Sequence, residues 1–380
     1  MTAGIYIHIP FCVKKCAYCD FYSLPEGVVP RRFVDALCRE IVMAAKQYDH
    51  PDITTIYVGG GTPSLLKPLE FQRILDAVND SFNMSIDTEI TLEANPGTTD
   101  PNKLFYYKQA GVNRLSIGAQ AYQPRLLALL GRIHGWDDVE WTMRTARASD
   151  ITNLSLDLIY GIPTQSLDDW RETLDRTLGL HPKHVSCYEL TLEPGTPMHT
   201  RCNGISGDLT NSLLDEQTIL SMQDMTVGLL AKAGLERYEI SNYSRSGFES
   251  RHNLGYWMRQ PYLGFGPAAH SQWGSERLAN PSDYNAWRES IDSGRLASST
   301  LETLTSRDAA FETMMLGLRL VKGVDLSFFN NTYNLTPFDL WPNELQRMRD
   351  TGWMKWDAKQ LWLTPLGLDL HNAVCELLMG

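Results

Sequence analysis

Short β-rich runs alternate with longer amphipathic stretches over the first 240 residues, and this alternation constrains the fold more than any other feature of the chain. Such alternation is typical of parallel sheets whose strands are joined by helices. Apolar residues at helical spacing are clearest over residues 71–82 and 139–148. Because six βα units are fewer than the eight of a closed barrel, we predict an α/β fold with an open, partial (β/α)6 barrel. The six predicted strands cover residues 5–9, 53–58, 89–93, 114–117, 153–158 and 184–190.

Past residue 240 the composition changes to an aromatic and Gly-rich stretch, which is followed by helical patterns. Helices are predicted over residues 309–320 and 338–350, a short strand over 361–363, and a last helix after Pro365. This order predicts a small, mainly helical, winged-helix-like domain. The expected division is a barrel over 1–240, a connecting segment over 241–300 and a C-terminal domain over 301–380.

Polar and glycine residues gather where the predicted strands end. In a βα barrel the functional site lies at the C-terminal ends of the strands, so the loops that follow them should face one mouth. The second strand is followed by three glycines, 59–61, which let backbone groups come close to a ligand because no Cβ intervenes. One polar residue at a strand end is explained by an internal hydrogen bond, but several together fit a ligand site better. The polar residues of this kind are Glu93, Gln120, Arg132 and Asp157.

The loop after the first strand carries Cys12, Cys16 and Cys19 in a C-x3-C-x2-C spacing. Three thiolates on one loop can hold three irons of a [4Fe-4S] cluster, since cluster irons are normally bound by one Cys each. The fourth iron then stays open to a small molecule, as the metal of a catalytic site does. A structural zinc would need a second ligand pair, and the odd, sparse set of seven Cys argues against a disulfide framework. Small buried hydrophobic roles are predicted for the other four, Cys38, Cys187, Cys202 and Cys375.

The composition excludes some function classes. A net charge of -11 without long basic runs argues against general nucleic-acid binding, which depends on neutralising phosphates. The sequence lacks an apolar stretch near the roughly 18 to 20 residues that span a bilayer, and no basic segment precedes the apolar run at the N-terminus. We therefore expect a cytoplasmic protein that is not integral to a membrane.

Taken together, the motifs resemble those of the radical SAM superfamily, and within it those of the HemW proteins, haem chaperones related to oxygen-independent coproporphyrinogen III oxidase. The matching segments are YIHIPFCVKKCAYCDF, VGGGTPS, EITLEANPG, GVNRLSIGAQ, GRIH, LDLIYGIP and HNLGYW. The resemblance implies a [4Fe-4S] cluster on Cys12, Cys16 and Cys19, with S-adenosyl-L-methionine (SAM) on the open iron. Whether one or two SAM molecules bind is left open. Residues matching the family's SAM contacts are Tyr6, Tyr18, Gly60, Gly61, Thr62, Glu93, Gln120, Arg132 and Asp157.

The H-N-L-G-Y-W element, with His252, Asn253, Tyr256 and Trp257, resembles a hallmark of HemW proteins. A neutral imidazole can ligate haem iron, and neighbouring aromatic rings can pack on a porphyrin face. The resemblance makes His252 the leading candidate for a haem contact. The competing interpretation is a packed histidine that hydrogen-bonds its neighbours. His270 is a secondary candidate, and His8 is expected to point into the barrel or against the Cys loop.

The resemblance implies a haem chaperone that binds haem and transfers it to an acceptor protein, such as an apo-cytochrome of a respiratory complex. One alternative is the oxidase reaction, oxidative decarboxylation of coproporphyrinogen III. Two departures argue against it: Asp20 and Phe21 follow Cys19 where the oxidase has C-G-C, and only five residues precede Tyr6. A third hypothesis is another radical SAM reaction on a tetrapyrrole, such as ring opening or methyl transfer.

Overall fold

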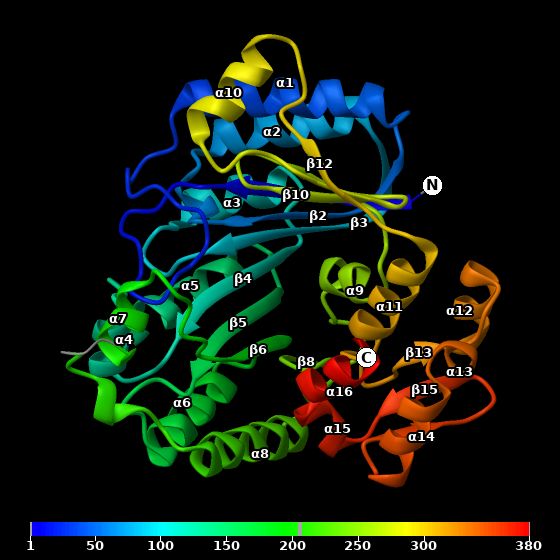
Figure 1. Cartoon of the computed structure of the whole chain (residues 1–380). Coiled ribbons are helices and arrows are strands. Elements are labelled where there is room, and N and C mark those ends of the chain that lie inside the picture. Colours follow the sequence, from blue (N-terminus) through cyan, green and yellow to red (C-terminus); the bar gives the residue numbers. More distant parts are fainter. Residues whose placement is uncertain (1, 204–206, 380) are drawn as a thin grey trace.

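The computed structural model describes residues 2–203 and 207–379, and its central feature is a curved sheet with helices packed on the outer face (Figure 1). Six parallel strands form the middle of this sheet in sequence order, which confirms the predicted partial barrel. They are β1 (Thr2–Ile9), β2 (Asp52–Gly60), β3 (Asn83–Ala94), β4 (Arg114–Gln120), β5 (Asn153–Tyr160) and β6 (His184–Glu189).

Helices connect these strands and bury their apolar faces against the sheet. In the first of them, Phe33, Leu37 and Ile41 follow one another at four-residue spacing and are fully buried. The fifth connection begins after Ser166, whose hydroxyl accepts a hydrogen bond from the Asp169 N–H and so caps the helix. The connecting helices are α1 (Arg31–Gln47), α2 (Pro68–Ser81), α3 (Pro101–Gln109), α4 (Pro124–Leu130), α5 (Trp136–Ala148) and α6 (Leu167–Gly179), with a short 3-10 helix at Pro63–Leu65.

The chain after β6 returns to both edges of the same sheet. On one edge β8 (Asn242–Ser244) pairs with β6, and β7 (Glu236–Arg237) pairs with β8. On the other edge β9 (Tyr262–Phe265) pairs in parallel with β1, and three antiparallel strands follow it. These are β10 (His270–Trp273), β11 (Glu276–Ala279) and β12 (Ser299–Thr303); the helices of this region are α7 (Pro197–Asn203), α8 (Glu216–Lys232), α9 (Arg251–Trp257) and α10 (Tyr284–Asp292), with a 3-10 helix at Thr210–Ser212.

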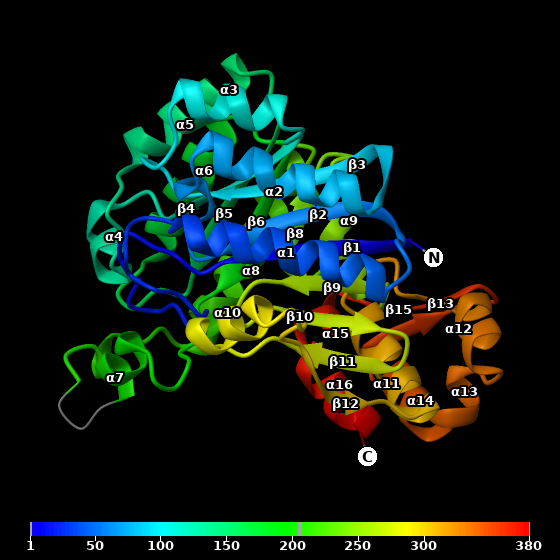
Figure 2. The same cartoon turned by 90° about the horizontal axis from the view of Figure 1, so that it is seen from above.

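Residues 241–300 are the segment that the sequence analysis predicts to connect the barrel and the C-terminal domain. They contribute strands on both edges of the barrel sheet, and Figure 2 shows β9 to β12 continuing the sheet beyond β1. A buried carboxylate holds this addition to the first helix. Glu40 of α1 accepts hydrogen bonds from the Gly266 N–H at 2.8 Å, the Asn280 amide at 2.7 Å and the Trp287 indole at 3.0 Å. The segment is thus tied to the barrel both by strand pairing with β1 and by these hydrogen bonds to α1.

The C-terminal part is mainly helical with a small antiparallel sheet, as the winged-helix-like prediction has it. Its sheet runs in the order β13 (Val324–Asp325), β15 (Gln360–Leu363), β14 (Met354–Trp356). Pro342 interrupts the helix predicted over 338–350 and divides it into two. The helices are α11 (Ser306–Gly317), α12 (Leu326–Tyr333), α13 (Pro337–Leu340), α14 (Pro342–Asp350), α15 (Pro365–Asp369) and α16 (His371–Met379). Within the described ranges, no helix has the length and apolar character needed to cross a bilayer.

The two faces of the barrel sheet differ in chemistry. Alternate residues of β1, such as Ile5 and Ile7, pack outward into the main apolar core beneath the helices. The intervening residues face inward, and on the neighbouring strands this inward set includes Tyr57, Ser116 and Asp157. The barrel interior is therefore lined by hydroxyl and ionisable groups, which all need hydrogen-bond partners or a ligand.

Candidate functional site

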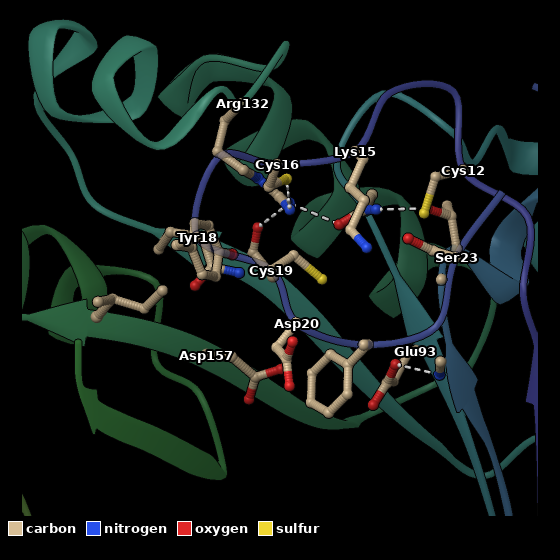
Figure 3. A pocket seen from close by; sticks show the side chains of 18 of the residues that line it. Cys12, Lys15, Cys16, Tyr18, Cys19, Asp20, Ser23, Glu93, Arg132 and Asp157 are labelled. Carbon is tan, nitrogen blue, oxygen red and sulfur yellow. Dashed lines mark hydrogen bonds between the residues drawn. The ribbon is translucent and has the colours of Figure 1, made fainter. Parts of the chain in front are cut away.

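A cavity of about 540 Å³ opens at the C-terminal ends of the parallel strands, where the barrel prediction places the site. The loop between β1 and α1 covers one side of it, and the ends of β2 to β6 line the other. Figure 3 shows the sulfur-bearing loop on one side of this space and the carboxylates Glu93 and Asp157 on the other. The structure thus brings the predicted motifs of separate strands to one place.

Backbone hydrogen bonds close the Cys loop at its base. The Cys12 N–H donates to the Leu24 carbonyl at 2.9 Å, and the Gly27 N–H donates to the Cys12 carbonyl at 2.8 Å. Cys12 is buried, whereas Cys16 and Cys19 are partly exposed, and all three line the cavity. A loop fixed at both ends can present three sulfur atoms without ordering a long flexible segment on binding.

Two side chains from outside the Cys loop donate hydrogen bonds to its sulfur atoms. The Thr62 hydroxyl lies 3.4 Å from Cys12 Sγ, and the Arg132 guanidinium lies 3.5 Å from Cys16 Sγ. Burial raises the pKa of the Cys12 and Cys19 thiols, so both stay protonated until a metal displaces the protons. Hydrogen bonds to sulfur of this kind are one of the means by which proteins tune cluster potentials.

Among the described residues, no three His, Cys, Asp or Glu side chains converge tightly enough to hold a single metal ion. A [4Fe-4S] cluster makes a different demand, because each Cys binds a different iron and the sulfur atoms stay apart. Three Cys side chains on one loop meet this demand.

The three glycines after β2 let their loop touch the Cys loop. A Cβ added to Gly61 would lie 2.9 Å from the Phe11 carbonyl oxygen and 3.0 Å from Cys12 Sγ, which no side chain tolerates. Gly60 has a φ of +111°, a conformation that L side chains rarely adopt. Glycine at these positions is thus required for the backbone to form the cavity wall beside the cysteines.

Two partly buried carboxylates lie in the wall opposite the cysteines. Glu93 accepts hydrogen bonds from the Tyr57 hydroxyl at 2.8 Å and the Gly60 N–H at 3.2 Å, and Asp157 accepts one from the Ser186 hydroxyl at 2.7 Å. Burial raises the pKa of Glu93 to about 7, with a smaller contribution from the charge of Asp157. Burial also raises the pKa of Asp157. Such a pair favours a ligand that carries positive charge.

Arg132 and Gln120 offer a site for negative or polar ligand groups. The Arg132 guanidinium donates to the Gly118 carbonyl at 2.9 Å and to the Asn95 side chain, yet its Nε is buried without a partner among the described residues. Gln120 has a φ of +68°, which is unusual for a residue with a side chain and is often found at functional sites. The cavity can therefore pair with both signs of charge, as the sulfonium, ammonium and carboxylate groups of SAM would require.

The structure brings most of the predicted cofactor contacts together. Tyr6 is the exception: it is absent from the cavity wall, because its hydroxyl lies 3.0 Å from His8 Nδ1 and its ring stacks on Tyr57 one layer deeper in the barrel. The predicted residues that line the cavity are Cys12, Cys16, Cys19, Tyr18, Gly60, Gly61, Thr62, Glu93, Gln120, Arg132 and Asp157.

His252 lies on α9, toward the N-terminal ends of the strands, and does not line the cavity. Its Nδ1 is 2.8 Å from the Thr55 hydroxyl and its Nε2 is 2.9 Å from the Tyr256 hydroxyl. Both nitrogens are therefore used inside the protein, and a haem contact at this residue stays a prediction that requires one of these bonds to open. His270 is exposed at the start of β10, and His8 Nε2 lies 2.9 Å from the Tyr22 carbonyl of the Cys loop.

Sequence reasoning missed several residues of the cavity. Tyr57 and Ser116 each alternate with buried aliphatic residues along a strand, and this period of two could have identified them. The remaining ones lie in loops or near strand ends, where no local pattern marks them. They include Lys14, Lys15, Asn95 and Tyr188.

Comparison with known proteins relates this geometry to two family models and to whole-chain relatives. A model of the radical SAM superfamily matches residues 6–177, and a model of the HemN C-terminal domain matches residues 304–370. A relative named heme chaperone HemW, from Bacillus subtilis, is 33% identical over 378 residues, which cover 99% of this chain and 98% of the relative. A HemW from Synechocystis sp. is 38% identical over 333 residues, which cover 85% of this chain and 79% of that one.

Among solved structures, coproporphyrinogen III oxidase (HemN) from Escherichia coli, described as a radical SAM enzyme, superposes with a TM-score of 0.85. The match covers 99% of this chain and 89% of the oxidase at 22% sequence identity. At this identity the likeness shows a common fold.

Proposed function

Because the chain belongs to the HemW family of radical SAM proteins, we propose that it binds haem and transfers it to an acceptor protein. The observation that carries this proposal is the likeness to proteins named heme chaperone HemW along nearly the whole chain, at 33% identity over 378 residues in one of them. That span includes the Cys loop, the strands after residue 240 and the C-terminal helices. An apo-cytochrome of a respiratory complex is the acceptor that we infer, and the cytoplasm is the expected compartment.

We further infer that Cys12, Cys16 and Cys19 hold a [4Fe-4S] cluster and that the cavity holds SAM. Support comes from the three sulfur atoms on one closed loop, the two carboxylates in the opposite wall, and the Nε of Arg132, which has no partner among the described residues. Together the two cofactors would supply one-electron cleavage of the sulfonium, a chemistry that belongs to the cofactors themselves. The chain's own residues would bind and orient SAM and limit the access of water.

Titration of Glu93 should make SAM affinity depend on pH. The pKa of this carboxyl is raised to about 7, so it loses its negative charge as the pH falls through that value. Since a cation binds the charged form, affinity should be about tenfold lower near pH 6 than near pH 8. Anaerobic equilibrium dialysis with the cluster-loaded chain measures this. Glu93→Gln should bind weakly with a flatter profile, and tighter wild-type binding at the lower pH would contradict the role of Glu93.

Haem binding and transfer can be tested directly on the anaerobically reconstituted chain. Addition of haem should shift and intensify the Soret band until the sites are filled, and later addition of an apo-cytochrome should move the haem spectrum to that of the holo-acceptor. A chain that leaves the free-haem spectrum unchanged, or that retains its haem in the presence of the acceptor, would contradict the proposal.

The same preparation separates the chaperone from the oxidase. Incubation with coproporphyrinogen III, SAM and a reductant should yield no protoporphyrinogen, because we propose haem as cargo. Formation of protoporphyrinogen would replace the proposal with the decarboxylation reaction. Mass spectrometry of the recovered porphyrin would also detect ring opening or methyl transfer.

A further inference from the structure

The H-N-L-G-Y-W element forms α9, which lies inside the open side of the barrel, at the opposite end of the strands from the Cys loop (Figure 1). Its first turn is fixed to β3 by a carboxylate. Glu89 accepts hydrogen bonds from the N–H groups of Arg251 and His252, each at 3.1 Å. Glu93, in the cavity wall, follows on the same strand. The element is therefore anchored to a strand that also shapes the cavity.

His252 is held in one orientation by its partners. The side chain is 3% exposed, and its two ring nitrogens are hydrogen-bonded to Thr55 and Tyr256. Burial lowers the pKa of this histidine to about 3, with a smaller contribution from the positive charge of Arg114. The ring is therefore neutral, so one nitrogen donates a hydrogen bond and the other accepts one, and rotation of the ring would break both.

Tyr57 connects this histidine to the cavity. Its ring stacks on the His252 ring with centroids 5.2 Å apart and an interplanar angle of 26°, and Tyr6 stacks on Tyr57 as well. The Tyr57 hydroxyl donates to Glu93 Oε1 at 2.8 Å. Because stacking fixes the plane of the tyrosine, it also fixes the direction from which the hydroxyl reaches the carboxylate.

Two glycines make room for these contacts. A Cβ on Gly4 of β1 would lie 2.9 Å from the Thr55 hydroxyl oxygen and 3.3 Å from the His252 ring. A Cβ on Gly59 of β2 would lie 2.9 Å from the Tyr57 ring and 3.1 Å from the Glu93 carboxylate. Glycine at these two positions therefore leaves room for the contacts among His252, Tyr57 and Glu93, and a larger residue would displace these side chains.

A second series of hydrogen bonds reaches α9 from the other cavity carboxylate. Asp157 is 3.5 Å from the Ser155 hydroxyl, which is 2.8 Å from His184 Nδ1. His184 Nε2 is in turn 2.8 Å from the Tyr238 hydroxyl, which accepts the N–H of Ser250, the residue that caps α9. Both cavity carboxylates are therefore connected to the same short helix through the polar barrel interior.

We propose that His252 is a positioning residue for the cofactor cavity: it fixes the Tyr57 ring, and Tyr57 orients the Glu93 carboxylate toward the bound cation. The proposal rests on SAM binding in this cavity as part of the proposed function. It gives the H-N-L-G-Y-W element a role in the cavity that is independent of any haem contact. Through Trp257, whose ring lies 4.2 Å from the Arg319 guanidinium of the C-terminal region, the same helix also contacts that region.

The dissociation constant of SAM, measured by anaerobic dialysis on the full cluster-loaded chain, tests this arrangement. Tyr57→Phe should weaken binding about tenfold, since one hydrogen bond to a carboxylate is lost. His252→Ala should weaken binding several-fold, and the double variant should be little weaker than Tyr57→Phe, because both changes act through Glu93. The change that SAM causes in the electron paramagnetic resonance spectrum of the reduced cluster should be altered alike in the two single variants.

Two further variants complete the test, one that removes a partner of His252 and one that serves as a control far from the cavity. Thr55→Val keeps the shape of the side chain, removes the hydrogen bond to His252 Nδ1, and should weaken SAM binding in the same direction as His252→Ala. Tyr333→Phe removes the hydroxyl that bonds to Thr313 and to the Ala309 carbonyl in the C-terminal domain, and should leave SAM affinity unchanged. SAM affinity within twofold of wild type in both His252→Ala and Thr55→Val would overturn the proposal, as would full additivity with Tyr57→Phe.

A haem titration of the same proteins separates this inference from the proposed function. If His252 acts only as a haem ligand, His252→Ala will alter the Soret band but keep the SAM affinity of the wild type. Tyr57→Phe will then leave the Soret band unchanged, and the positioning role fails. If the wild-type chain binds haem but not SAM, the positioning role fails and the chaperone proposal stands. If it binds SAM with the expected variant effects but not haem, the chaperone proposal fails alone.

Discussion

Replacement of Cys16 by serine should remove most of the iron and sulfide that the reconstituted chain retains, and the same is expected for Cys12 and Cys19. Each change removes the thiolate of one iron, and a neutral hydroxyl is a poor substitute ligand. The partly buried carboxyl groups of Glu93 and Asp157 cannot move into the place of a lost sulfur, because they lie in the opposite wall (Figure 3) and are held there by hydrogen bonds to Tyr57 and Ser186. Iron and sulfide analysis, with the visible absorbance of the cluster, measures the loss.

Cys38 and Cys375 provide matched controls for this experiment. Cys375 is buried on α16, as predicted. Cys38 on α1 is only partly buried, which differs from the prediction. Both lie outside the cavity wall. Cys38→Ser and Cys375→Ser should therefore keep the iron content of the wild type, and a loss comparable to that of Cys16→Ser would contradict the ligand assignment.

Replacement of Glu40 by alanine should lower the free energy of unfolding by roughly 4 kcal/mol, because three buried donors lose their acceptor. These donors are the Gly266 N–H, the Asn280 amide and the Trp287 indole N–H. Urea unfolding, followed by tryptophan fluorescence, gives the change in midpoint and slope. Asp35→Asn on the same helix removes only a surface ion pair with Arg73 and should cost less than about 1 kcal/mol.

The pH dependence of stability gives a second measure of Glu40. Burial raises its pKa to about 7 from an ordinary value of 4.5, so the folded chain holds the proton more tightly than the unfolded chain does. The contribution of Glu40 to stability should therefore fall as the pH rises from 4.5 toward 7. If Glu40→Ala unfolds within about 1 kcal/mol of the wild type near pH 4.5, where the contribution of Glu40 should be largest, the contact between α1 and the late strands is weak.

The six parallel strands were predictable because each has an apolar outer face of several residues, as in Ile5, Ile7 and Ile9 of β1. The edge strands were not, since β8 to β12 are three to five residues long and lie among aromatic and glycine residues. Every residue of β12 is exposed, so no alternation marks it. Their position depends on pairing with β1 and β6, which are distant in sequence, and no local pattern carries that information.

The site shows the same limit. The spacing of Cys12, Cys16 and Cys19 and their place after a strand indicated one loop at the barrel mouth, and the structure has this loop. The position of His252 could not be inferred in this way. Its partner Thr55 is 197 residues away in the sequence, and only the folded barrel shows that the two side chains meet. The residue types therefore indicated which ligands the site can bind, whereas the packing of α9 decides whether the ring nitrogens of His252 are free to bind one.

The pairing of β9 with β1 has a consequence for the synthesis of the chain. β1 emerges first from the ribosome, yet Gly4 pairs with Tyr262, so one of its edges must wait for about 258 further residues. At elongation rates of about 5 to 20 residues per second, this interval is roughly 13 to 50 seconds. During that time an apolar strand with an unpaired edge is open to association with other nascent chains. We expect that this edge is covered only after β9 (Tyr262–Phe265) has been synthesised.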